Sequence, residues 1–276
     1  MIRLTHPFPS ILDGLVSGSV AILAGAPAPT AIRLGLAMMA LQLGIGAVND
    51  LVDAPRDAGR KPGKPIPAGL VSHQMARLIA LGAFGLGLLL AASAGQLVAG
   101  LAVVVIAIGL AYDLVLKGTA WSWLPFAVGI PVLPVFGWVG ATGGLAPMFG
   151  VLVPAAVAAG AALAIANSLV DVERDREAGA SSVALALGEG TARVVEIALL
   201  GGIAAAAAGS VLAFGGGWPA GMVVGLLGCL PLLAARIAGP AGPAASADPA
   251  RRELAWRVQA VGLGLLAVAW IAAVTR

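Results

Sequence analysis

Apolar runs of about 20 residues recur from one end of this chain to the other, and they restrict its fold more than any other feature. A helix of that length crosses the hydrocarbon core of a bilayer. Ala and Leu dominate the runs, and the alternation typical of membrane β-barrels does not occur. Only 11% of the 276 residues are charged, too few to cover a soluble fold with a polar surface. The chain is therefore predicted to be an all-α, polytopic membrane bundle.

Nine membrane spans are expected, and the charged residues decide their orientation. The spans are placed at residues 10–26, 30–48, 73–94, 97–116, 121–141, 147–168, 191–213, 218–237 and 253–274. With the N-terminus in the cytoplasm, all 16 basic residues except Arg33 and Arg276 fall on the cytoplasmic side, in accord with the positive-inside rule. The net charge of +3 is thus a topology signal, and no nucleic-acid partner is expected. We expect one domain over residues 1–276, in a bacterial or archaeal cytoplasmic membrane.

One acidic stretch occurs twice. NDLVDAPRD at residues 49–57 and NSLVDVERD at residues 167–175 share six of nine positions, namely Asn, Leu, Val, Asp, Arg and Asp. Each copy closes an even-numbered span, so both are expected on the cytoplasmic side. Four spans separate the copies, which suggests that a unit of about four helices was reused in the same orientation.

The spacing of the polar residues predicts a shared helix face. In the second copy, Asn167, Asp171 and Asp175 recur every four residues. The first copy has the same spacing at Asn49, Asp53 and Asp57, with Asp50 in addition. Two acidic helix ends are therefore expected at the cytoplasmic face.

Pro55 distinguishes the two copies. A proline lacks the backbone N–H that continues a helix. We therefore expect the first helix to end near Ala54 and Asp57 to lie in the following loop. The second copy has no proline and is expected to stay helical for longer.

The acidic stretches predict a divalent metal ion and a phosphate-bearing substrate. Two carboxylates about 5 Å apart at an effective dielectric of about 20 repel by roughly 3 kcal/mol, so a cluster needs cations. The ligand set is all oxygen, which suits Mg²⁺ or Mn²⁺. Mg²⁺ usually combines a few carboxylates with phosphate oxygens. His6 and His73 lie far apart in the sequence and are not expected to bind metal or act in catalysis.

Basic residues near the first copy agree with this interpretation. AGRKPGKPIPAG at residues 58–69 carries Arg60, Lys61 and Lys64 in a loop rich in Gly and Pro. Such cations can hold the outer oxygens of a diphosphate. Tyr112 and Lys117, in YDLVLK, are expected on the same side of the membrane.

Together these motifs resemble those of the UbiA family of intramembrane prenyltransferases, over nearly the whole chain. The family's first signature, like NDxxDxxxD, stands here as Asn49, Asp50, Asp53 and Asp57. A basic stretch like RPIPSG follows it in the family, and here it reads GKPIPAG. The second signature, like DxxxD with RxxG, stands as Asp171, Asp175, Arg176 and Gly179. The expected nine spans also match the family.

The resemblance implies a prenyl transfer within the membrane. A polyprenyl diphosphate loses its diphosphate with the help of Mg²⁺, and an aromatic or other lipid-precursor acceptor attacks the allylic cation. The metal ligands implied are Asp50, Asp53, Asp57, Asp171 and Asp175. Substrate-binding roles fall to Asn49, Arg60, Lys64, Asn167 and Arg174. Catalytic roles fall to Asp53, Asp171, Lys117 and Tyr112.

One departure from the family concerns a cation. Many members carry a Lys shortly after the second signature, in a stretch like GVKTLP. Here Ser181 stands at that position, and Arg174 or Lys117 is the candidate to supply the missing charge. The departure concerns diphosphate binding and leaves the metal ligands in place.

Three other classes of protein were weighed. A UbiA-related terpene cyclase would use the same ionisation without an acceptor. A transporter is less expected, because the carboxylates sit at one interface rather than at mid-membrane. A CDP-alcohol phosphotransferase has one compact acidic motif instead of two. The acceptor, the prenyl length and the oligomeric state are not specified by these residues.

Overall fold

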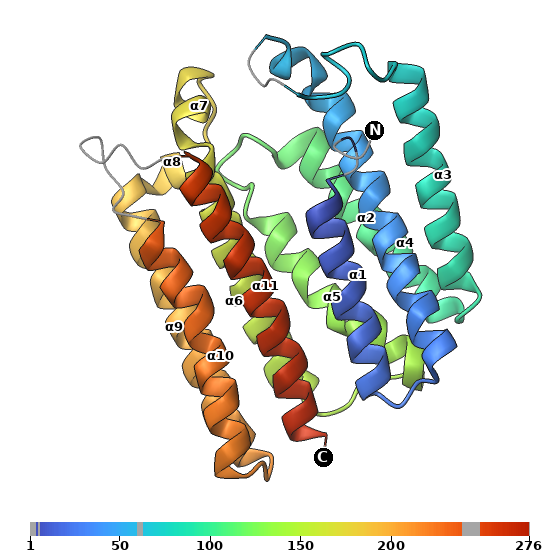
Figure 1. Cartoon of the computed structure of the whole chain (residues 1–276), viewed down its shortest axis with the longest axis vertical. Coiled ribbons are helices and arrows are strands. Elements are labelled where there is room, and N and C mark those ends of the chain that lie inside the picture. The colour runs from blue at the N-terminus through green and yellow to red at the C-terminus, as the bar shows by residue number, and fades with distance from the viewer. Residues whose placement is uncertain (1–3, 5, 60–62, 239–248, 276) are drawn as a thin grey trace. The chain divides into compact units, whose positions relative to one another are not determined.

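The computed structural model describes residues 4, 6–59, 63–238 and 249–275. Every regular element in these ranges is a helix (Figure 1). The elements are α1 (Pro7–Leu23), α2 (Ala28–Asp57), α3 (His73–Ala92), α4 (Gln96–Ala111), η2 (Tyr112–Leu116), α5 (Leu124–Thr142), α6 (Phe149–Val170), α7 (Val172–Glu177), α8 (Val183–Leu187), α9 (Glu189–Ala213), α10 (Trp218–Ile237) and α11 (Pro249–Val274).

Eight helices of the described chain are long and apolar enough to cross a membrane: α2, α3, α4 with η2, α5, α6, α9, α10 and α11. The prediction of an all-α, polytopic membrane protein is confirmed. The apolar helix α1 has 17 residues and is shorter than the other eight. Nine spans and a cytoplasmic N-terminus therefore stay predictions.

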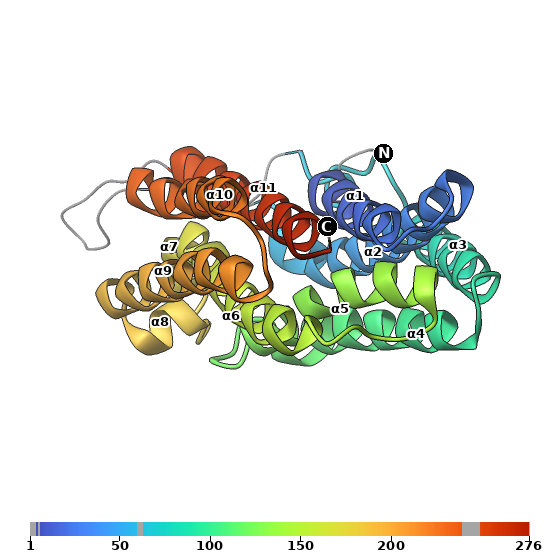
Figure 2. The same ribbon diagram turned by 90° about the horizontal axis from the view of Figure 1, so that it is seen from below.

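The chain divides into two compact units. The first comprises Met1–Val115 and Val132–Leu145. Within it, α2 packs against both α1 and α3 (Figures 1 and 2). Gly14 of α1 and Gly35 of α2 allow this close approach, because a Cβ on either would lie within 3 Å of the other's carbonyl oxygen. Small residues are what allow helix backbones to meet in membranes.

The second unit comprises Leu116–Pro131 and Ala146–Arg276. In it, α10 packs against α9 and α11, and α6 packs against α9 and α11 (Figure 2). The amide Nε2 of Gln259 on α11 donates a 2.8 Å hydrogen bond to the carboxylate of Glu196 on α9. Arg193 donates a 2.7 Å hydrogen bond to the other oxygen of the same carboxylate. Glu196 is fully buried, so the Gln259 bond joins α9 to α11 inside the unit.

Candidate active site

The first acidic stretch lies on one buried face at the end of α2. Asp50, Asp53 and Asp57 are 3%, 6% and 5% exposed, and they follow one another at helical spacing. Pro55 and Arg56, on the opposite face, are exposed. The predicted face therefore exists in the first unit, and it points into the protein.

The expectation that Pro55 ends this helix is wrong. The helix continues to Asp57, which is buried rather than placed in a loop. The missing N–H removes one bond of the helix, and membrane helices tolerate that loss. The chain leaves the helix at Ala58, and Gly59 follows with a φ of +73°, a conformation that suits glycine after a helix end.

Asp50 has two different oxygen environments. Its Oδ1 accepts a close contact from Lys64 Nζ and lies 3.0 Å from Nε2 of His6. Its Oδ2 is buried and has no hydrogen-bond partner among the described residues. Lys64 also lies 3.8 Å from Asp57. A buried carboxylate oxygen without a donor is a position that a cation can satisfy.

A small apolar cluster holds the segments that carry these contacts. Leu4, Ala54, Ile66 and Val71 are buried together with Ala76 at the start of α3. The loop after Lys64 is closed by its own backbone, since the N–H groups of Ala68 and Leu70 donate to the carbonyls of Lys64 and Pro65 at 3.1 and 3.0 Å. Leu4 and the loop after Lys64 are thus both packed onto the end of α2.

Asn49 and the end of α4 form a second polar contact in the first unit. The side-chain amide of Asn49 donates a 2.6 Å hydrogen bond to Asp113, which is buried. Asp113 belongs to η2, a π-helical turn that also carries Tyr112. Single π-helical turns often occur at functional sites. Asn49 therefore orients a carboxylate that was not among the predicted site residues.

The second acidic stretch is broken, contrary to the expectation that it stays helical for longer. Helix α6 ends at Val170, Asp171 has a φ of −102° and a ψ of 7°, and α7 begins at Val172. Asn167, Asp171 and Asp175 remain partly exposed while their neighbours Ser168 and Val172 are buried. A 2.8 Å bond from the Asp175 N–H to the Asp171 carbonyl closes the first turn of α7.

Arg252 of α11 explains how the break is stabilised. One guanidinium nitrogen donates a 3.0 Å hydrogen bond to the carbonyl of Leu169, within the last turn of α6. The same guanidinium donates two 2.8 Å bonds to the carboxylate of Glu173 in α7. Burial alone would raise the pKa of Glu173, but the hydrogen bond and charge of Arg252 outweigh it and hold that pKa below its usual range. Arg252 therefore ties both sides of the break to α11.

Ser181 lies beside the loop that carries Lys117. The Ser181 N–H donates a 2.9 Å hydrogen bond to the carbonyl of Gly118, the residue after Lys117. Arg174, the other candidate to replace the missing cation, forms a close ion pair with Asp171. The backbone of the Lys117 loop therefore lies next to Ser181, whereas Arg174 is paired with Asp171.

Some predicted site residues are not brought together. Arg60 and Lys61 lie outside the described residues. Within the ranges that the structure describes, no group of three or more His, Cys, Asp and Glu side chains is arranged to hold a metal ion. In the first unit, Lys64 and His6 take the contacts to Asp50 Oδ1 that a metal ion would compete for.

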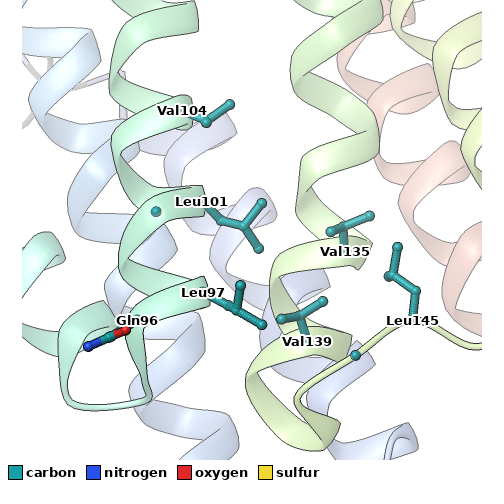
Figure 3. A pocket seen from close by; sticks show the side chains of 9 residues that line it. Gln96, Leu97, Leu101, Val104, Val135, Val139 and Leu145 are labelled. Carbon is teal, nitrogen blue, oxygen red and sulfur yellow. The ribbon is translucent and has the colours of Figure 1, made fainter.

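An apolar groove of about 540 Å³ lies elsewhere in the first unit. Figure 3 shows Leu97, Leu101 and Val104 of α4 opposite Val135 and Val139 of α5. None of the described residues that line it is ionisable. It lies toward the start of α4, whereas Asp113 follows the end of that helix. This groove is therefore no phosphate site.

The described chain is a helical membrane protein, and the comparisons with known proteins identify it as a prenyltransferase. The chain belongs to the UbiA prenyltransferase family, whose family model matches residues 14–251. The resemblance seen in the motifs is thus confirmed.

Two relatives are named digeranylgeranylglyceryl phosphate synthase. The protein of Methanopyrus kandleri is 33% identical over 232 residues, covering 81% of this chain and 80% of the relative. That of Methanoregula boonei is 30% identical over 226 residues, covering 79% of each. The alignments thus span about four-fifths of both partners.

Solved structures share the fold. A UbiA homolog from Aeropyrum pernix K1 superposes with a TM-score of 0.76 at 20% identity, covering 98% of both chains. A homolog from Archaeoglobus fulgidus bound to GPP and Mg²⁺ has a TM-score of 0.74 at 18% identity, covering 100% of this chain and 99% of that one. These likenesses extend over essentially the whole chain.

Sequence reasoning missed His6 and Arg252. His6 precedes a proline in an apolar N-terminal stretch and carries no local motif. Arg252 follows another arginine at a helix start, and only burial distinguishes the two, since Arg251 is exposed. Their roles depend on partners distant in the sequence, Asp50 and Glu173.

Proposed function

We propose that this protein joins a geranylgeranyl group to geranylgeranylglyceryl phosphate and so forms digeranylgeranylglyceryl phosphate. The observation that carries this proposal is the identity of 33% and 30%, over about four-fifths of the chain, to two synthases of that name. The reaction is a prenyl transfer, which is the family's chemistry. We further propose that it occurs at the cytoplasmic side of the cell membrane, where the predicted topology places both acidic stretches.

Both acidic stretches are proposed to serve one prenyl diphosphate through divalent metal ions, Mg²⁺ or in its place Mn²⁺. The donor set fits, because it is all carboxylate oxygen and includes the buried, partnerless Oδ2 of Asp50. The homolog from A. fulgidus has GPP and Mg²⁺ bound. The proposed ligands are Asp50, Asp53, Asp57, Asp171 and Asp175. When bound, the metal supplies positive charge that stabilises the leaving diphosphate.

Basic and amide side chains are proposed to bind the diphosphate oxygens. Lys64 already contacts Asp50 and can turn its ammonium group to a phosphate. Lys117, beside Ser181, supplies the charge that the Ser181 position lacks. Arg60, Arg174 and the amides of Asn49 and Asn167 complete the proposed binding set, and the hydroxyl of Tyr112 is proposed to contact the reacting end of the donor.

The bond changes follow from the two substrates. The allylic C–O bond of the donor breaks, and its electron pair leaves with the diphosphate. The free hydroxyl oxygen of geranylgeranylglyceryl phosphate forms the new ether bond to the allylic carbon, and its proton passes to the released diphosphate. Apolar helices exclude water, which would otherwise consume the allylic cation. The donor and the acceptor both carry phosphate, in agreement with the basic residues Arg60, Lys61 and Lys64 that follow the first acidic stretch in the sequence.

The test uses the full-length protein in detergent with Mg²⁺, geranylgeranyl diphosphate and geranylgeranylglyceryl phosphate. Mass spectrometry is expected to show the diether phosphate, and diphosphate release is expected to stop with EDTA. D53N and D171N should each lower the rate by about 10²- to 10³-fold, because each removes charge from the proposed metal ligands. E177Q is the matched control, since Glu177 is exposed and outside the proposed set.

Three results would contradict the proposal. Wild-type activity in D53N or D171N would remove one acidic stretch from the mechanism. Prenyl transfer only to another acceptor, such as a hydroxybenzoate or a naphthoate, would overturn the proposed substrate. A hydrocarbon product formed without any acceptor would favour the terpene cyclase.

A further inference from the structure

We propose that His6 is a positioning residue that holds Oδ1 of Asp50 and so presents Oδ2 of that carboxylate to the catalytic cation. This inference rests on the proposed function, because it assigns Asp50 to the metal ligands. It concerns a histidine that lies outside both acidic stretches. Two independent observations carry it: the contact to Asp50 and the backbone conformation of His6 itself.

The contact with His6 gives the two oxygens of the Asp50 carboxylate different roles. Nε2 of His6 lies 3.0 Å from Oδ1, within hydrogen-bond distance. The neutral imidazole donates this bond when Nε2 carries the proton. Oδ2 of the same carboxylate is buried without a described donor. Because one oxygen is held, rotation of the carboxylate is restricted and the other oxygen keeps a defined direction.

The backbone of His6 supports a functional role. His6 has a φ of 45° and a ψ of 62°, and it is the one residue other than glycine with positive φ in the described part of the chain. A side chain makes this conformation unfavourable, and it persists where the surroundings impose it. Glycine would fit the turn better, so the imidazole is retained at a conformational cost.

The neighbours of His6 show what imposes this conformation. Leu4, two residues earlier, is fully buried in the cluster with Ala54 of α2. On the other side, the backbone N–H and the hydroxyl of Ser10 both donate to the His6 carbonyl, at 3.4 and 3.1 Å. The segment is therefore anchored on both sides of His6, and one anchor is the helix that carries Asp50.

Lys64 does not make His6 redundant. Lys64 contacts the same Oδ1 and lies 3.4 Å from Nε2 of His6. Its ammonium group sits on a flexible four-carbon chain and is proposed to move to the diphosphate. When the Lys64 ammonium group moves away, His6 remains as a hydrogen-bond donor to Oδ1 of Asp50. Asp50 would then keep its orientation during the reaction.

The experiment compares Mn²⁺ binding and kinetics in full-length variants. Mn²⁺ alone is titrated into protein in detergent and followed by electron paramagnetic resonance. H6A is expected to bind Mn²⁺ about 10- to 100-fold more weakly, the range found when a partner of a metal ligand is removed. Its activity should recover at raised Mg²⁺, whereas H73A, which alters an exposed histidine, should match the wild type.

Two further variants separate the side chain from the turn. H6Q places an amide N–H near the position of Nε2 and is expected to restore most of the Mn²⁺ affinity. H6G relaxes the backbone but has no donor, so it should bind as weakly as H6A. Wild-type affinity in H6A or H6G would overturn the inference, as would an H6Q variant as weak as H6A.

The result also distinguishes this inference from the proposed function. Mn²⁺ binding that is lost in D53N but unchanged in H6A refutes the role of His6 alone. A wild-type protein that binds no Mn²⁺ refutes the metal site and the role of His6 together. Circular dichroism and gel filtration confirm that each variant is folded.

Discussion

Replacing Arg252 by Met should destabilise the second unit far more than replacing its partner Glu173 by Gln. Arg252 is 6% exposed and bridges the break between α6 and α7. Its bond to the Leu169 carbonyl is buried and charge-assisted, and bonds of that type contribute about 1.5–3 kcal/mol. The Glu173 side chain is 50% exposed, so its ion pair contributes at most about 1 kcal/mol.

These magnitudes predict a clear ranking. R252M loses both interactions and should cost about 2–4 kcal/mol, whereas E173Q keeps the Leu169 bond and should cost less than about 1 kcal/mol. A loss of about 1 kcal/mol lowers the Tm of a chain of this size by about 2–4 °C. R252M should therefore unfold at least about 4 °C below the wild type, and E173Q within about 4 °C of it.

Thermal unfolding in one detergent, followed by circular dichroism, measures the ranking. R251M is the matched control, because Arg251 is the exposed neighbour on the same helix and should leave the Tm unchanged. The double variant R252M/E173Q should unfold close to R252M, since R252M has already removed the ion pair that E173Q would break. A Tm of E173Q as low as that of R252M would contradict this ranking, as would equal Tm values for R252M and R251M.

Two further predictions concern the same unit. Because the pKa of Glu173 is lowered from 4.5 in the folded protein, its pairing stabilises fully above about pH 4.5, and this contribution is lost as pH falls through the lowered pKa. The Tm difference between wild type and E173Q should therefore shrink on acidification, and a constant difference would contradict the assignment. In G160A the new Cβ would lie 2.1 Å from the Phe126 carbonyl oxygen, so a cost of about 2 kcal/mol or more is expected, measured as a lower Tm. G202A, whose Cβ would meet nothing within 4 Å, is its control, and equal Tm values in the two variants would refute the clash.

The sequence predicts the helices well because long apolar runs leave few alternatives in a membrane. It also identifies the acidic stretches, since their residues are close together in the chain. The two predictions about helix ends are wrong. Helix α2 continues past Pro55 to Asp57, and the second acidic stretch is interrupted after Val170. Rules based on neighbouring residues judge Pro55 without its tertiary surroundings. They also cannot include the hydrogen bond that Arg252, far away in the sequence, donates to the Leu169 carbonyl of α6.

The N-terminal contact shows the same limit of local reasoning. Nothing within several residues of His6 indicates Asp50, because the two are 44 positions apart. The cluster of Leu4, Ala54 and Ile66 brings them together. The tertiary structure is needed to show that His6, which belongs to no local motif, contacts the first acidic stretch.

The buried pairing of Glu196 with Gln259 has a consequence for biogenesis. Glu196 is synthesised and inserted with α9, yet its partner Gln259 arrives with α11, the last helix of the chain. A carboxylate in a membrane span is costly until it finds its partners. Arg252 is also on α11, so its hydrogen bond to the Leu169 carbonyl, beside the second acidic stretch, forms only once the same helix is present. The polar contacts of the second unit are therefore completed only when α11 has been inserted, and a chain cut short before α11 lacks the Gln259 bond to Glu196.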